Sequence, residues 1–261
     1  MVYNGIGYFL ILHGLSKIND LLNFRRPIPI DPEENMIYFT GDTHGELSRF
    51  KTSAAKKLKK GDTLIICGDF GFIWNESKEE LGNIKWLSKR KYQILFVEGA
   101  HENFELLEKF PKVDFCGGRA RKISENIYQL MRGEIFEIEG KKIFAFGGGD
   151  DEELDVNDFR ECPDFVRLPS EEECEHAREN LEKTEKQVDY IVSYDTGFKM
   201  RGFLEMESNC FNNLHAFLNE VSIDCKFEKW FFGCFHIDRR VPPFYYAVYE
   251  NIYDSETGKE L

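Results

Sequence analysis

The chain contains no apolar run that approaches the roughly 18 residues that a membrane-spanning helix needs. The nearest candidate, residues 5–15, is short and contains His13. It also lacks the basic start and the small-residue cleavage site of a signal peptide. We therefore expect no membrane association and a cytoplasmic protein.

Paired cysteine motifs are missing as well. The seven cysteines are scattered along the chain, and no two are spaced as C-x-x-C. An odd number of scattered thiols is typical of a reduced cytosolic protein and argues against a disulfide framework.

Basic residues are in the minority, with 34 Lys and Arg against 47 Asp and Glu and a net charge of −13. This balance argues against binding of a nucleic-acid backbone through bulk charge. A bound metal can still create a local anion site in an acidic protein, so a small phosphorylated ligand is compatible with it.

The composition, 42% hydrophobic and 15% aromatic, indicates a globular fold. We expect three parts: an N-terminal extension over 1–35 (a short helix and a proline-rich connector), one domain over 36–252, and a polar tail over 253–261. The extension could be a docking or dimerisation arm, a helix packed on the domain, or an upstream addition to a domain that begins at Met36. The sequence indicates no oligomeric state.

Apolar runs separated by amphipathic stretches begin at Met36. They predict strands over 36–40, 63–67 and 92–97, with helices near 46–60, 77–90 and 102–110. Three short strands over 126–131, 134–138 and 141–146 then predict an antiparallel meander.

A helix is expected to begin at Ser170, where Glu173 completes a capping box. Beyond it we expect strands 188–193 and 229–233, a helix near 208–221 and a hairpin arm over 245–252. The fold class is α/β (α+β), with a two-layer central β-sandwich flanked by helices.

Metal-ligand residue types follow four of the predicted strands. They lie in Gly41-Asp42-Thr43-His44-Gly45, Gly68-Asp69, Gly99-Ala100-His101-Glu102 and Gly233-Cys234-Phe235-His236. Open α/β sheets place their binding crevices at the ends of strands, and glycine lets the backbone turn sharply beside a ligand. A single Asp or His after a strand is usually a turn residue, but four such ends in this order indicate a site.

Residues 36–252 resemble the bacterial calcineurin-like metallophosphoesterases, chiefly in 37–45, 65–74, 96–107 and 229–236. A weaker resemblance to the family occurs in Leu130-Met131-Arg132-Gly133 and Leu168-Pro169-Ser170. The resemblance implies a β-sandwich flanked by helices and two divalent metals that share a bridging hydroxide, polarise phosphoryl oxygens and supply the nucleophile.

The resemblance implies four ligands for the first metal, and all four are present in this chain: Asp42, His44, Asp69 and His236. Two imidazoles and two carboxylates suit Mn, Fe or Zn. His101 matches the family histidine that protonates the leaving group or contacts phosphate. Asp69 and His101 are thus the expected catalytic residues.

The second metal would share Asp69 and add an asparagine and two histidines. Those three positions hold Ala100, Tyr194 and Cys234. The expected cofactor is therefore one divalent metal, with no intact second site. Tyr194 and Cys234 could be fillers, or they could ligate a softer or ferric ion as phenolate and thiolate.

Three readings stay open. The protein keeps one metal and binds a small phosphorylated ligand with weak or lost hydrolysis; it is a phosphoester hydrolase with a mononuclear or rebuilt site; or it is a non-catalytic interaction scaffold. Arg239 and Arg240, just beyond His236, could steer phosphate into the cleft or simply belong to an exposed hairpin.

Overall fold

The computed structural model describes residues 35–149, 168–204 and 212–261. The expectations for residues 1–34 lie outside these ranges. Contacts within the chain separate Met1–Glu34 from Asn35–Leu261, and only the second unit is described below. None of the described helices combines the length and the apolar character that crossing a bilayer requires.

Two sheets form the centre of this unit. The first has seven strands in the order β13-β1-β2-β3-β6-β5-β4, and the second has six in the order β11-β12-β10-β9-β8-β7. The strands of the first sheet are β1 (Ile37–Thr40), β2 (Thr63–Cys67), β3 (Gln93–Val97), β4 (Lys112–Phe115), β5 (Gly118–Lys122), β6 (Ile127–Leu130) and β13 (Tyr253–Asp254). Those of the second are β7 (Glu134–Ile138), β8 (Lys141–Phe146), β9 (Tyr190–Ser193), β10 (Lys229–Phe232), β11 (Arg239–Val241) and β12 (Tyr245–Ala247).

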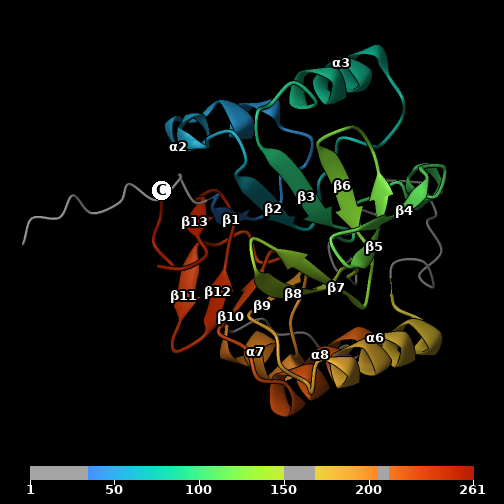
Figure 1. The fold of residues 1–261 in the computed structure, drawn as a ribbon, viewed down its shortest axis with the longest axis vertical. Coiled ribbons are helices and arrows are strands. Elements are labelled where there is room, and N and C mark those ends of the chain that lie inside the picture. Colours follow the sequence, from blue (N-terminus) through green and yellow to red (C-terminus); the bar gives the residue numbers. More distant parts are fainter. Residues whose placement is uncertain (1–34, 150–167, 205–211) are drawn as a thin grey trace, which may run out of the picture. The chain divides into compact units, whose positions relative to one another are not determined.

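Helices cover the outer face of each sheet, so the unit has four layers (Figure 1). The first sheet is covered by the 3-10 helix η1 (Leu47–Lys51), α2 (Ser53–Lys57), α3 (Lys78–Leu87) and α4 (Phe104–Leu107). Beneath the second sheet lie α6 (Glu171–Lys183), α7 (Phe198–Phe203) and α8 (Asn213–Asp224). This arrangement confirms the expected sandwich flanked by helices.

Alternation along the strands builds the core between the sheets. In β1, Phe39 points toward the second sheet and stacks on Phe231 of β10, with ring centroids 4.0 Å apart. Its neighbour Tyr38 points the other way, into the apolar layer beneath the helices. Both faces of the strands are therefore buried, which explains why their apolar runs show no strict alternation in the sequence.

The meander expected over 126–146 is wrong. β7 and β8 do form an antiparallel hairpin, but β6 pairs in parallel with β3 in the first sheet. The three residues Met131, Arg132 and Gly133 carry the chain from one sheet to the other. Gly133 has φ +76°, and a Cβ there would lie 2.9 Å from the Cβ of Ala177 in α6. A short connection that ends in Arg-Gly has the same pattern as a hairpin turn, so the sequence did not distinguish the two.

The chain end also differs from the expected polar tail over 253–261. β13 pairs antiparallel with β1, and the amide of Leu261 donates to the carbonyl of Ile252. The edge of the first sheet supplies backbone partners, so polar side chains do not prevent these residues from joining the fold.

The two stretches with a weaker family resemblance, 130–133 and 168–170, lie next to each other at a buried ion pair. Arg132 donates from Nε to Glu98 at 2.5 Å and from Nη1 to the carbonyl of Leu168 and to Glu173. Gln129 donates to the other oxygen of Glu98. Ser170 and Glu173 form the capping box expected from the sequence. The network joins the end of β3, next to Ala100 and His101, to the start of α6.

Replacing Arg132 by Met should lower the free energy of unfolding by about 3 kcal/mol, because Glu98 keeps its charge in a buried position without its cation. Urea unfolding measures the loss. The double variant Arg132→Met with Glu98→Gln is the control, and it should recover much of the stability. A single variant as stable as the wild type would contradict the role of the pair.

Candidate metal centre and pocket

The site lies where corresponding ends of the two sheets meet. Asp42, Asp69 and His101 follow the parallel strands β1, β2 and β3 of the first sheet, and His236 follows β10 of the second. Gly233 permits this approach, because a Cβ there would lie 2.1 Å from Oδ1 of Asp42 and 2.4 Å from the carbonyl oxygen of Cys67. The strand-end pattern in the sequence thus maps to one place in the fold.

Three of the expected ligands converge. One ligand atom from each of Asp42, His44 and His236 lies within 4.8 Å of the others. Nε2 of His236 is 3.2 Å from Oδ2 of Asp42 and 3.0 Å from Nε2 of His44. Neighbouring ligands that each lie about 2.1 Å from one ion are themselves about 3.0–3.4 Å apart, so this set fits a single divalent cation.

The turns that carry these ligands are tied together through the backbone. The amides of Thr43 and His44 donate to the carbonyl of Asp69, at 3.0 and 2.8 Å. His44, Asp69 and His236 all have positive φ, of 46°, 39° and 49°. Non-glycine residues adopt this conformation at a cost, and such strain concentrates at functional sites.

Asp69, the expected shared ligand, directs its carboxylate elsewhere. Oδ1 accepts from the backbone amide of His101 at 2.7 Å, and Oδ2 lies 3.0 Å from Nδ1 of the same residue. The structure therefore places the two expected catalytic residues in contact with each other. The role of Asp69 as a metal ligand stays a prediction.

Burial and neighbouring charges set the protonation of the ligands. Burial raises the pKa of Asp42 to about 6; Asp69 adds to the rise, and the hydrogen bond from His236 opposes it. Burial lowers the pKa of His44, which keeps its imidazole neutral. A buried carboxylate with a raised pKa beside neutral imidazoles is an arrangement that a cation would stabilise.

Arg49 is a contributor that the sequence pattern did not reveal. Its guanidinium donates to the carbonyl of Asp42 at 2.9 Å and to that of Tyr249, and it lies 5.1 Å above the Tyr249 ring. That ring is 4.9 Å from the imidazole of His236. Arg49 thus supports one ligand from each sheet. An arginine in a short helix after His44 carries no motif, so no signal pointed to it.

Glu102 was seen in the sequence but given no role. It is buried, and its Oε1 accepts from the amide of Phe70 at 2.7 Å, which holds the turn after Asp69. Burial, reinforced by the charge of Asp69, raises the pKa of this carboxyl well above its usual range.

The three second-metal positions are filled with side chains that pack. Ala100 is buried and offers no ligand atom. The ring of Tyr194 lies against Gly68 and Gly149, where an added Cβ would come within 2.1 and 2.3 Å of ring carbons. The backbone amide of Cys234 donates to Asp42 at 3.0 Å. Burial raises the pKa of the Tyr194 phenol and of the Cys234 thiol well above their usual ranges, with nearby carboxylates adding to each rise.

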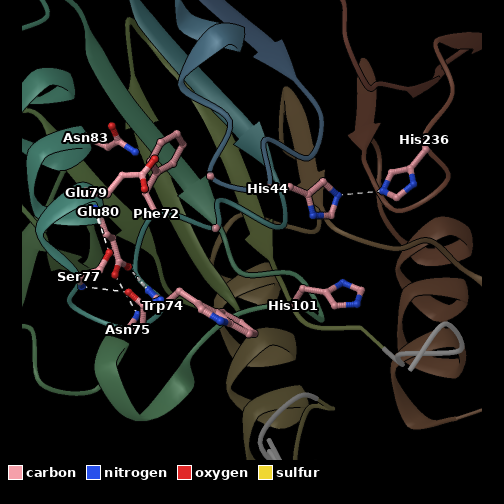
Figure 2. A pocket seen from close by; sticks show the side chains of 12 residues that line it. His44, Phe72, Trp74, Asn75, Ser77, Glu79, Glu80, Asn83, His101 and His236 are labelled. Carbon is pink, nitrogen blue, oxygen red and sulfur yellow. Dashed lines mark hydrogen bonds between the residues drawn. The ribbon is translucent and has the colours of Figure 1, made fainter. Parts of the chain in front are cut away.

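An open pocket of about 500 Å³ adjoins the metal centre (Figure 2). His44, His101 and His236 line one end of it, which we call the imidazole end. The other end, which we call the outer end, is lined by Trp74, Asn75, Ser77, Glu79, Glu80 and Asn83. Arg239 and Arg240 are exposed on β11 and are not among the described residues that line this pocket. Their steering of phosphate stays a prediction.

Comparison with known proteins gives the class. A model of the calcineurin-like phosphoesterase family matches residues 36–200, more than half of the chain. The chain therefore belongs to this family.

Among solved structures, a putative 5′-nucleotidase from Staphylococcus aureus in complex with alpha-ketoglutarate is similar, with 13% identity and a TM-score of 0.43. The match covers 82% of this chain and 48% of that one, so the chain spans about half of that structure's length. A search among curated proteins finds no match.

The metal-free protein should lose stability through Asp42 as the pH rises. Its folded-state pKa of about 6 lies above the ordinary value of 3.8, so the folded state binds the proton more tightly. The contribution of Asp42 to the free energy of unfolding is present at low pH and is lost as the pH rises through about 6. The loss is on the order of 2 kcal/mol between pH 4 and 7.5. Urea unfolding of the wild type and of Asp42→Asn, with a chelator and at both pH values, isolates this contribution. Equal pH dependence in the two proteins would contradict the assignment.

Proposed function

We propose that this protein binds one divalent metal through Asp42, His44 and His236 and holds a phosphate ester in the adjoining pocket, with hydrolysis weak or lost. The observation that carries the proposal is the position of Tyr194. Its ring occupies space between Gly68 and Gly149 at one of the positions where the family supplies a second-metal ligand, while three of the four expected first-metal residues converge.

The donor set supports a metal such as Mn, Fe or Zn, because it combines two imidazoles with a carboxylate. Bound there, the ion would supply Lewis-acid polarisation of a phosphoryl oxygen. His101 lines the same pocket, and the contact of its Nδ1 with Asp69 orients the ring toward a bound ester. Binding and orientation thus need only residues that this chain retains.

We expect hydrolysis to be weak, because Ala100, Tyr194 and Cys234 stand at the positions where the resemblance places second-metal ligands. In the family, charge that develops in the transition state is shared between two metals, and losing one preorganised stabilising group can cost on the order of 10²–10³ in rate. Tyr194 and Cys234 are poor substitutes as ligands, since their raised pKa values favour the neutral phenol and thiol.

A mononuclear hydrolase is the second candidate, and the intact contact between Asp69 and His101 favours it. In that case Asp69→Asn should abolish turnover of an aryl phosphate, because it loosens the imidazole that would protonate the leaving group.

Metal analysis of protein purified without chelator should find one equivalent per chain. Asp42→Asn should reduce the content to near zero, since it removes the carboxylate that faces both imidazoles. Glu172→Gln, an exposed change on α6, is the matched control and should keep the full content. Two equivalents per wild-type chain would contradict the proposal.

Restoring the family ligands should restore catalysis. The triple variant Ala100→Asn, Tyr194→His, Cys234→His frees the space that Tyr194 fills and returns three donors. With Mn²⁺, its rate on an aryl phosphodiester or phosphomonoester should exceed that of the wild type by roughly 10²-fold or more. Circular dichroism checks that the variant folds. A folded triple variant that binds two metals and gains no activity would count against a cleft prepared for phosphoester chemistry.

A further inference from the structure

The pocket beside the metal centre extends well beyond the space that a phosphate group needs. Under the proposed function, its imidazole end holds the phosphoryl group, whereas its outer end, about one helical turn of α3 and the loop before it, carries a different chemistry. The outer end therefore has to select the organic part of an ester.

Phe72 and Trp74 are the large aromatic side chains among the described residues that line this pocket; Phe72 is buried, and Trp74 is partly exposed. Figure 2 shows its indole between His101 and the stretch that carries Asn75, Ser77 and Glu80. Its backbone is fixed from two sides: the amide donates to Glu80, and the carbonyl accepts from Nδ2 of Asn103 at 2.7 Å. The backbone that carries the indole is therefore held in place beside the pocket.

The charge of the outer end is negative. Glu79 and Glu80 line it, and the described lining includes no Lys or Arg. Glu80 uses both oxygens on backbone amides, those of Trp74 and Asn75. Glu79 is exposed, and none of the described residues forms an ion pair or hydrogen bond with its carboxylate. A second phosphate or a carboxylate on the ligand would meet repulsion here, whereas a cation would meet both a carboxylate and an aromatic face.

On these grounds we propose that the pocket takes a monophosphate ester of an amino alcohol, with its ammonium or quaternary ammonium group at Trp74 and Glu79 and its phosphate at the imidazole end. The inference rests on the proposed function, because it requires phosphate to bind beside the metal. It adds a substrate class that the family fold does not specify.

A pair of isosteric ligands tests the charge preference. Choline phosphate and 3,3-dimethylbutyl phosphate have the same shape, but only the first has a positive charge. Titration calorimetry on the full chain loaded with Mn²⁺ should show choline phosphate binding about tenfold more tightly, the combined effect of one cation–π contact and one exposed carboxylate. Inorganic phosphate, measured in the same way, reports on the imidazole end alone.

Variants at the outer end test whether Trp74 and Glu79 cause the preference for choline phosphate over 3,3-dimethylbutyl phosphate. Glu79→Gln should reduce the ratio between the two esters about threefold, and Trp74→Leu should reduce it similarly, while Trp74→Phe should keep most of it. Glu172→Gln is the matched control, because it also removes an exposed glutamate from the first turn of a helix, and it should leave the ratio unchanged.

The outcomes separate this inference from the proposed function. If inorganic phosphate binds and the two esters bind equally, the amino-alcohol inference is overturned and the phosphate site stands. A preference for choline phosphate that survives both Glu79→Gln and Trp74→Leu would also overturn it. If neither ester nor phosphate binds the metal-loaded protein, the proposed function fails and the inference fails with it.

Discussion

The site depends on one buried carboxylate that joins the two sheets. Asp42 leaves the end of β1 and accepts a hydrogen bond from the amide of Cys234 after β10, and Nε2 of His236 lies 3.2 Å from its Oδ2. A buried charge is costly without partners, so these contacts hold the ends of the sheets together at Gly233. The remaining cost appears as the raised pKa of Asp42, and a cation would relieve it. Arg49, the Asp69 turn and the ring of Tyr249 all support this one contact from different sides.

Around this contact, two groups of side chains offer different things. Asp42, His44 and His236 converge as ligand types and His101 contacts Asp69, whereas Tyr194 is buried and packs against Gly68 and Gly149.

Much of the fold could be predicted because its strands are buried on both faces and end in glycine. The runs before Asp42, Asp69 and His101 became β1, β2 and β3 as expected. The errors have a common cause in long-range pairing. β6 and β7 are separated by a turn that looks like a hairpin turn, yet they belong to different sheets. The strands β4 and β5 were not expected, since their short, charged sequences resemble loops.

Residue identity and spacing alone showed which ligand types are present and that they follow strands; the resemblance to the family added the prediction that Ala100, Tyr194 and Cys234 stand where second-metal ligands would. These are local properties, readable wherever an apolar run ends. Three-dimensional packing was needed to show that Asp42, His44 and His236 converge while the carboxylate of Asp69 contacts His101, that Tyr194 occupies space between two glycines, and that Trp74 lies in the same pocket as the imidazoles. Such facts depend on side-chain direction and on contacts between residues far apart in the chain, which spacing does not encode.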